Sequence, residues 1–457
     1  MASALTSRPV LELTAPDGTL IGIPPEVPTL AARLRAAGFA TAAFVANGTL
    51  REGNGFAQGF DRFETTGDPA DPPPDAAPLL AAARGWLAEH AGEDAFVWLH
   101  LMEPHEPLRD HAGRGRAAAP SKALASRERP ATPEEAATIR ELYRLEVAHA
   151  DELLAPFLRE LPARAVVALT ADHGEMLGEG TVWGHGLTLY DPVLRVPFLL
   201  RAPDSAGVRD DQPAELLDLV PTLLARLGVA APSGALAGVD LLSRARRDRP
   251  RLAATFSAGP LRWAYRRGGL AALAHFAPQG ALSATARTVS QEVRPLPSGV
   301  WAYAPGEEPV GRAGAPLAGE ALAEVAASFA RDVGQMVPGY QALVVEHAAD
   351  AELAFAVSGG VELAQVHAPA PVRLAREADR LALSWPAPQP LALVAFGRGA
   401  AVRPVSPLLG PRWRVGDRTP PPVEVPGLLL WRNPRAATAQ HPQAEILEHL
   451  RALGYLR

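Results

Sequence analysis

The 457-residue chain contains no cysteine. Disulfide bonds, thiolate nucleophiles and zinc–thiolate sites are therefore excluded for this sequence. Lysine is almost missing as well, because Lys122 is the only one and the other positively charged side chains are arginines. We attribute this bias toward arginine to a GC-rich genome rather than to function.

The chain also lacks a surplus of basic charge. Its net charge of −6 and isoelectric point near 6.1 argue against a nucleic-acid partner, although a local basic site for an anionic substrate is compatible with them. No apolar run approaches the length of a transmembrane helix. Residues 1–8 show no basic stretch followed by an apolar core, so they do not form a signal peptide. An export signal upstream of Met1 would place the protein in the periplasm, outside the cell or at a membrane.

Helical and strand patterns alternate along the first half of the chain, which is typical of an α/β fold. Residues 28–38 have apolar positions at helical spacing and a glycine stop, and residues 39–46 are typical of a short buried strand. Thr132 and Glu135 form a predicted capping box, at the start of a helix that reaches about Arg159. Similar patterns predict helices over 79–90 and 213–228, and strands over 95–99, 165–169 and 193–200.

The pattern changes after about Pro250, where short apolar runs are broken by proline and glycine. We therefore predict one domain over residues 1–250 and an α+β region over residues 251–457, with a small β-rich module around 339–430. In this second region we expect strands over 263–276, 300–304, 342–345, 353–357, 391–396 and 428–431, and helices over 317–333 and 444–453.

Asp172 and His173 follow the apolar run 165–169 almost directly. Ligands of open α/β sheets bind beyond the carboxyl ends of the strands. A carboxylate beside an imidazole at such a place suits a divalent metal ion. Gly174 then lets the backbone turn without a Cβ clash. His185 returns on a second glycine-flanked loop, from which we expect it to reach the same place.

Other polar residues in these loops allow structural as well as functional interpretations. His105 follows the predicted strand 95–99 and is a candidate for substrate contact, whereas we expect His100 to pack or to form a structural hydrogen bond beside that strand. Trp183 suits a pocket wall and core packing equally well. We expect structural or solvent-facing roles for three further polar residues: His149, Asp151 and Asp218.

Five segments follow one another in a recognisable order: VPTLAARLRAAGFATAAFVAN (27–47), GFAQGFDRFE (55–64), FVWLHLMEPHEP (96–107), LTADHGEMLGE with WGHGLTLYDPVLRVPFLLRAP (169–203), and LLDLVPTLLARLGVAAPSGALAGVDLL (216–242). In this combination the chain resembles the sulfatases, within the alkaline phosphatase superfamily. The final stretch ILEHLRALGYL (446–456) also recurs in bacterial members of the family. Residues 280–430 show little of the resemblance.

The resemblance implies a sulfatase/alkaline-phosphatase-like three-layer sandwich around a mixed, mostly parallel sheet, with a smaller β-rich C-terminal region. It implies hydrolysis of a small-molecule or glycan sulfate ester, with Ca²⁺ or Mg²⁺ holding the sulfate oxygens. Asp172 and His173 match the family's later pair of metal ligands. His105 matches the substrate-binding histidine, with Glu103 where aspartate is commoner. His185 matches the basic residue that contacts sulfate and the leaving oxygen.

The chain departs from the family pattern at its start. Members begin with a strand that holds two aspartate ligands, followed by a nucleophile segment, and residues 1–7 are similar only to the tail of that segment. We therefore expect the nucleophile and two metal ligands to be missing from this chain. Three hypotheses stay open: a sulfatase-type hydrolase with an upstream N-terminal segment, a phosphodiester or phosphonate hydrolase or phosphoethanolamine transferase on the same fold, and a non-catalytic remnant.

Overall fold

The computed structural model describes residues 1–9, 13, 22–65, 75–111, 113, 131–179, 182–186, 188–203, 207–231, 236–243, 249–255, 262–267, 270–275, 299–303 and 332, and eight strands between residues 342 and 416. The expected elements over 317–333, 428–431 and 444–453 lie outside the described residues, apart from Asp332.

Strand β1 (Ala40–Val45) is the centre of a parallel sheet with the order β2-β1-β3, in which β2 is Arg62–Thr65 and β3 is Ala95–His100. Successive side chains of a strand point to opposite faces. Ala42 and Phe44 accordingly join one core cluster, and Ala43 and Val45 join another. Burial on both faces explains why every residue of β1 except Thr41 is apolar.

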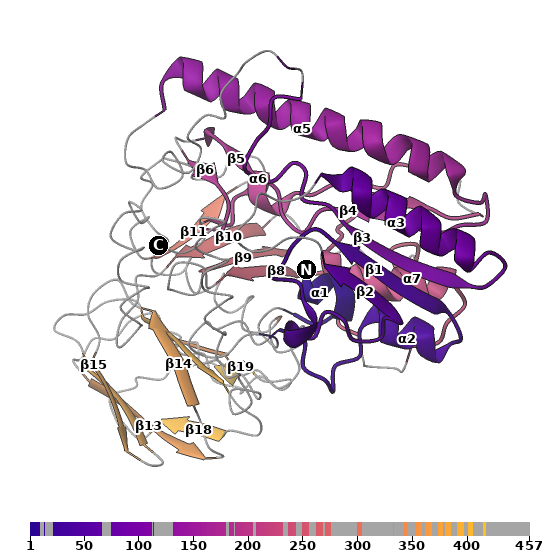
Figure 1. Cartoon of the computed structure of the whole chain (residues 1–457). Coiled ribbons are helices and arrows are strands. Elements are labelled where there is room, and N and C mark those ends of the chain that lie inside the picture. The colour runs from indigo at the N-terminus through magenta and orange to yellow at the C-terminus, as the bar shows by residue number, and fades with distance from the viewer. Residues whose placement is uncertain are drawn as a thin grey trace.

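Helices cover both faces of this sheet, as expected for a three-layer sandwich (Figure 1). On one face α3 (Ala76–Glu89) packs on β1 and β3, and α5 (Pro133–Glu160) packs outside α3. On the other face α2 (Leu30–Ala36) and α7 (Leu219–Arg226) share a core cluster with side chains of β3, β4 and β7. The predicted α/β class and layered architecture are confirmed.

The ends of α5 follow its sequence signals. Thr132 Oγ1 accepts a hydrogen bond from the Glu135 backbone N–H, and the Glu135 carboxylate accepts one from the Thr132 backbone N–H, so the predicted capping box is present. Pro156 lies inside the helix, which continues to Glu160. Among the described helices, none combines the length and the apolar character needed to span a membrane.

Three local predictions were wrong. The expected strand 263–276 is two antiparallel strands, β9 (Arg262–Arg267) and β10 (Leu270–His275). The expected strand 193–200 is divided into a short helix α6 (Asp191–Leu194) and strand β7 (Phe198–Arg201). Pro192 lies in the first turn of α6, where the fixed φ of proline favours a helix start. The expected helix 213–228 begins as a 3₁₀ turn η4 (Leu216–Asp218) followed by α7, because Glu215 is extended with φ −136° and ψ 158°.

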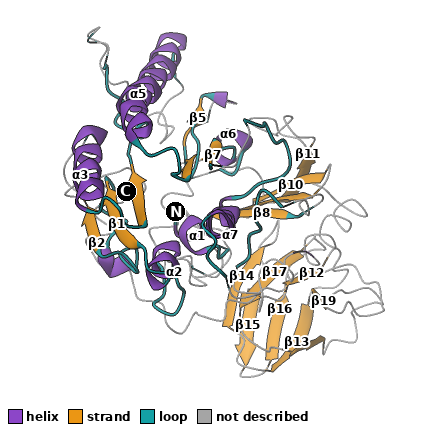
Figure 2. Cartoon of the chain, turned by 90° about the vertical axis from the view of Figure 1, so that its right-hand side faces the viewer, coloured by secondary structure: helices purple, strands orange, loops and turns teal. Residues whose placement is uncertain are grey.

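The remaining strands of the first half form two antiparallel pairs. Strand β4 (Val167–Thr170) pairs with β7, and β5 (Met176–Leu177) pairs with β6 (Trp183–Gly184). The first residues of the chain form the short helix α1 (Ala2–Thr6), which contacts η4, α7 and α2. Figure 2 shows α1 and α7 side by side.

The C-terminal half is rich in antiparallel strands, as the sequence pattern predicts. One sheet has the order β11-β10-β9-β8, and two further four-stranded sheets, β14-β17-β12-β19 and β15-β16-β13-β18, lie together away from α5 (Figures 1 and 2). The strands of the first sheet are β8 (Arg251–Thr255), β9 (Arg262–Arg267), β10 (Leu270–His275) and β11 (Gly299–Tyr303). The others are β12 (Ala342–Val345), β13 (Glu352–Ser358), β14 (Glu362–His367), β15 (Arg373–Glu377), β16 (Arg380–Ser384), β17 (Leu391–Phe396), β18 (Ala401–Pro404) and β19 (Val415–Gly416).

Candidate active site

The candidate site lies where three strands end. Asp172 and His173 follow β4 within three residues, His105 lies in the loop after β3, and His185 follows β6 directly. The loop after β4 depends on a close backbone approach, since a Cβ added to Gly174 would lie 2.1 Å from the Pro192 carbonyl oxygen. The Gly174 N–H donates to the Val193 carbonyl at 2.8 Å, which joins this loop to α6.

Three histidine rings meet at this point. The rings of His173 and His185 are stacked with centroids 4.1 Å apart, and the rings of His105 and His185 meet edge-to-face at 5.1 Å. The structure therefore brings together three residues that are separated by up to 80 positions in the chain, 105 to 185. Asp172 precedes His173, and its Oδ1 lies 3.8 Å from His173 Nε2.

Hydrogen bonds determine which ring nitrogens are available. His173 Nδ1 lies 2.9 Å from the Gly174 carbonyl oxygen, and His105 Nδ1 lies 2.7 Å from the Glu106 carbonyl oxygen. A carbonyl oxygen only accepts hydrogen bonds, so Nδ1 is the protonated nitrogen in both rings. In the neutral tautomer, Nε2 of each ring then has a lone pair. His173 is thus in the tautomer that a metal ligand requires.

Glu175 is a member of the site that the sequence analysis did not identify. Its Oε2 lies 2.8 Å from His185 Nδ1, and both side chains are only 10% exposed. Burial raises the pKa of the Glu175 carboxyl to about 7. Burial, with the neighbouring His173, lowers the pKa of His185 to about 4. In the sequence, the signal for Glu175 was its position two residues after His173. Its partner, His185, is evident only from the tertiary contact.

Charges around Asp172 keep this carboxylate ionised. Burial alone would raise its pKa, but the nearby His173 and His100 favour the anion, and the pKa is lowered to about 2. His100 is 8% exposed at the end of β3, and burial lowers its pKa to about 4. It packs edge-to-face against Trp98, while its Nδ1 is buried and has no hydrogen-bond partner among the residues that the structure describes. His100 therefore packs beside the strand, as expected, and also belongs to the electrostatic surroundings of Asp172.

A second polar cluster lies at the start of α3. One donor atom from each of Asp75, Glu103 and His149 lies within 4.8 Å of the others, a spacing that could hold a metal ion. Asp75 caps α3 through the Ala77 N–H, and His149 Nε2 lies 2.9 Å from Asp75 Oδ2. Glu103 Oε1 accepts from another N–H of the first turn at 3.0 Å. Because both carboxylates already bind the N-terminus of a helix, which favours anions, a capping network explains the cluster.

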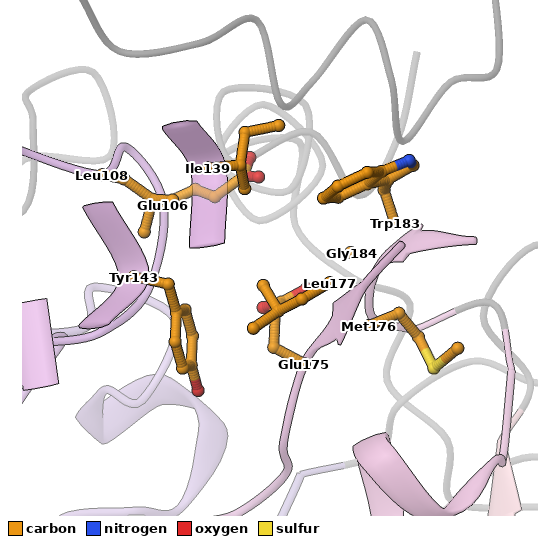
Figure 3. A pocket seen from close by; sticks show the side chains of 9 residues that line it. All are labelled: Glu106, Leu108, Ile139, Tyr143, Glu175, Met176, Leu177, Trp183 and Gly184. Atoms are coloured by element: carbon orange, nitrogen blue, oxygen red, sulfur yellow. The ribbon is translucent and has the colours of Figure 1, made fainter. Parts of the chain in front are cut away.

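A small pocket lies beside the loops that carry His105 and His185, and Figure 3 shows the side chains that line it. Its enclosed space is hardly larger than a water molecule needs, and Glu106, Glu175 and Gly184 line it near the histidines. Its apolar lining is formed by Leu108, Ile139, Tyr143, Met176, Leu177 and Trp183. Trp183 is 7% exposed and belongs to a core cluster, so it serves both roles that the sequence allowed, pocket wall and core packing.

Asp218 and Asp151 lie away from the histidines in different settings. Asp218 is fully buried and forms a paired hydrogen bond with the Arg249 guanidinium, both bonds 2.6 Å long. Asp151 is exposed on α5. These environments match the structural and solvent-facing roles expected for the two aspartates.

The sulfatase family profile matches residues 1–229, which is half of the chain. The uncharacterized sulfatase YidJ of Escherichia coli (strain K12) is 34% identical over 77 residues. This match covers 17% of the present chain and only 15% of that protein's length.

Two solved structures share the fold. The phosphonate monoester hydrolase SpPMH from Silicibacter pomeroyi has a TM-score of 0.53 at 16% identity, covering 74% of this chain and 85% of its own. A putative sulfatase from Bacteroides thetaiotaomicron VPI-5482 has a TM-score of 0.50 at 17% identity, covering 73% and 81%. At these identities the likeness concerns the fold.

Proposed function

The chain belongs to the sulfatase family, and on this premise we propose that it serves the metal-dependent hydrolysis of a sulfate ester. Members of this family are hydrolases that generally depend on a divalent metal ion. The main support for the proposal is the meeting of His105, His173 and His185 beside the ionised Asp172. We assign Asp172 and His173 to the metal, and His105 and His185 to the sulfate group.

The donor atoms of the first pair fit a metal ion. Asp172 offers an ionised carboxylate, and His173 offers Nε2 because its Nδ1 hydrogen is used by the Gly174 carbonyl. A hydrogen bond on the other ring nitrogen is the usual support of a metal-binding imidazole. A carboxylate suits Ca²⁺, Mg²⁺ or Mn²⁺, whereas an imidazole suits transition metals better. A divalent ion bound here would stabilise charge on sulfate oxygens as a Lewis acid.

His185 is oriented for a role at the leaving oxygen. Its Nδ1 is bonded to Glu175, and we assign its other ring nitrogen, Nε2, to the substrate. A proton shared between Glu175 and Nδ1 allows Nε2 to keep its hydrogen, so that His185 can donate it to the bridging oxygen as the bond to sulfur breaks. Water, the second substrate of the hydrolysis, would form the new bond to sulfur and return a proton to His185. The His105 ring meets the His185 ring edge-to-face at 5.1 Å, and we assign it to a nonbridging oxygen.

A phosphonate or phosphodiester substrate is the second candidate. The solved structure of a phosphonate monoester hydrolase shares the fold, and tetrahedral sulfate and phosphoryl groups require similar sites. We therefore propose side-by-side measurements on 4-nitrophenyl sulfate and 4-nitrophenyl phenylphosphonate with added Mn²⁺, Mg²⁺ or Ca²⁺. We expect metal-dependent release of nitrophenol, with the higher kcat/KM on the sulfate.

Asp172→Asn is the decisive variant for this proposal. It should abolish turnover and weaken metal binding at least about tenfold in calorimetry, since it removes the anionic ligand. Asp211→Asn is a matched control, because the Asp211 side chain is 79% exposed and pairs with the exposed Arg209. Turnover that survives both chelation and Asp172→Asn would overturn the proposal. Metal binding without turnover of either ester would favour the non-catalytic hypothesis.

A further inference from the structure

Helix α6 is in direct backbone contact with the loop that carries the candidate metal ligands. The Gly174 N–H donates to the Val193 carbonyl at 2.8 Å, and Gly174 directly follows His173. The Pro192 carbonyl lies so close to Gly174 that it leaves no room for a Cβ there. A movement of α6 would therefore displace the backbone beside Asp172 and His173.

Contacts outside α6 must fix the position of this helix, because it has only four residues. Helices this short are not stable on their own in water. Tyr190 and Val193 are buried in a core cluster that also contains Ala264 of β9, and Ala253 of β8 packs against that cluster. Figure 1 shows α6 between the β5–β6 hairpin and the sheet of β8 to β11. One side of α6 thus meets the C-terminal half of the chain.

An ion pair joins α6 to β9 at the same place. The carboxylate of Asp191, the first residue of α6, meets the guanidinium of Arg266. The side chain of Asp191 is 10% exposed and that of Arg266 is 15% exposed, so the two charges meet away from solvent. Apolar packing and a buried ion pair together hold α6 against the sheet.

Loss of Arg266 would leave the Asp191 carboxylate buried beside an apolar cluster. Removing one partner of a buried ion pair is strongly destabilising, because the charge of the other partner stays uncompensated. A rotation of α6 that exposes Asp191 to water would relieve this cost. Because Gly174 is hydrogen-bonded to α6, the same rotation would displace the loop of Asp172 and His173. The ion pair therefore stabilises the position of this loop from a distance.

We propose that Arg266 is a positioning residue of the candidate metal site, which acts through Asp191 and α6 on the loop that carries Asp172 and His173. This inference rests on the proposed function, because that function assigns metal binding to the two loop residues. Arg266 lies beyond residue 229, where the match to the sulfatase family profile ends. The C-terminal half thus contributes to a site whose assigned ligands lie in the first half.

The test measures two properties of the full chain: its affinity for Mn²⁺ by calorimetry and, without metal, amide hydrogen exchange in peptides that contain Gly174. Arg266→Met should weaken Mn²⁺ binding about tenfold, the lower end of the loss that follows removal of an outer partner of a metal ligand. The Gly174 amide should exchange faster, because its hydrogen bond to α6 opens more often. Arg267→Met is the matched control and should change neither property. Arg267 is the next residue of β9, on the opposite face, and pairs with Asp332.

Two further variants separate the ion pair from general damage to the fold. Asp191→Asn combined with Arg266→Met leaves no unpaired charge at the junction, so it should bind Mn²⁺ more tightly than Arg266→Met alone. Arg266→Lys keeps the charge but not the planar guanidinium, so it should show a smaller loss in the same direction and keeps the test open if Arg266→Met does not fold.

The outcomes distinguish this inference from the proposed function. Mn²⁺ affinity or Gly174 exchange that the Arg266 substitutions leave unchanged, or equal losses in Arg267→Met, would overturn the inference alone. The same holds if the double variant recovers no affinity. Absence of Mn²⁺ binding by the unaltered chain would overturn the proposed function and this inference with it.

Discussion

Replacing Arg249 with leucine should destabilise the protein by about 3 kcal/mol. Its guanidinium forms two 2.6 Å hydrogen bonds to Asp218, which is 0% exposed, and lies 3.2 Å from Glu215. Removing one partner of a buried ion pair typically costs about 3–5 kcal/mol, because the other charge stays buried. Asp218 keeps two backbone donors, the N–H groups of Glu215 and Val239, so we expect the lower end of that range.

The penalty should also depend on pH. Burial raises the pKa of Glu215 to about 7, even though Arg249 favours its ionised form. A folded-state pKa above the unfolded value contributes stability at low pH that is lost as the pH rises through the folded pKa. Arg249→Leu removes the cation and raises this pKa further. The penalty should therefore be larger at pH 8 than at pH 6.

Thermal and urea unfolding followed by circular dichroism measure both effects. A loss of about 3 kcal/mol corresponds to a decrease in Tm of roughly 6–12 °C for a domain of this size. Arg209→Leu is the control, since its partner is Asp211 and the two side chains are 89% and 79% exposed. Exposed pairs contribute about 0–1 kcal/mol. A decrease in Tm equal to that of the control, or a penalty that shrinks as pH rises, would refute the reasoning.

Three further substitutions test packing and backbone geometry in the first half of the chain. Gly59→Ala should lower the free energy of unfolding, measured with urea, by more than Gly38→Ala. Both glycines have a positive φ, but a Cβ at Gly59 would lie 2.1 Å from a backbone nitrogen of α2, whereas no atom lies within 4 Å of a Cβ at Gly38. An equal cost would contradict the clash. Leu79→Ala should lower the free energy of unfolding by about 3–5 kcal/mol, because Leu79 is a residue of α3 that packs against β1 and is only 1% exposed. A loss below about 1 kcal/mol would mean that the surrounding side chains fill the cavity. Thr132→Ala should cost about 1 kcal/mol through the lost cap of α5, with Thr132→Ser as the variant that retains stability.

Local elements of the fold were predictable because their signals are local. The capping box at Thr132 sets the start of α5 through bonds that span three residues. Strand β12 (Ala342–Val345) and strand β17 (Leu391–Phe396) coincide with the predicted ranges, since each is a compact apolar run. The error at Glu215 arose where distant contacts compete with local preference, because its carboxylate meets Arg249 and the Leu252 backbone N–H.

For the site, residue types and spacing already placed Asp172 and His173 beyond a strand end, and His105 and His185 on loops that could reach them. The sequence by itself thus determined the family, the layered α/β class and the identity of four candidate residues. Only the tertiary structure decided that Glu175 binds His185, that α5 and the β5–β6 hairpin enclose an apolar pocket, and that Arg249 neutralises Asp218. The physical reason is that each of these contacts joins side chains from elements that are distant in the sequence and meet only when the chain folds. Local periodicity and helix caps do not specify which partner a buried side chain contacts.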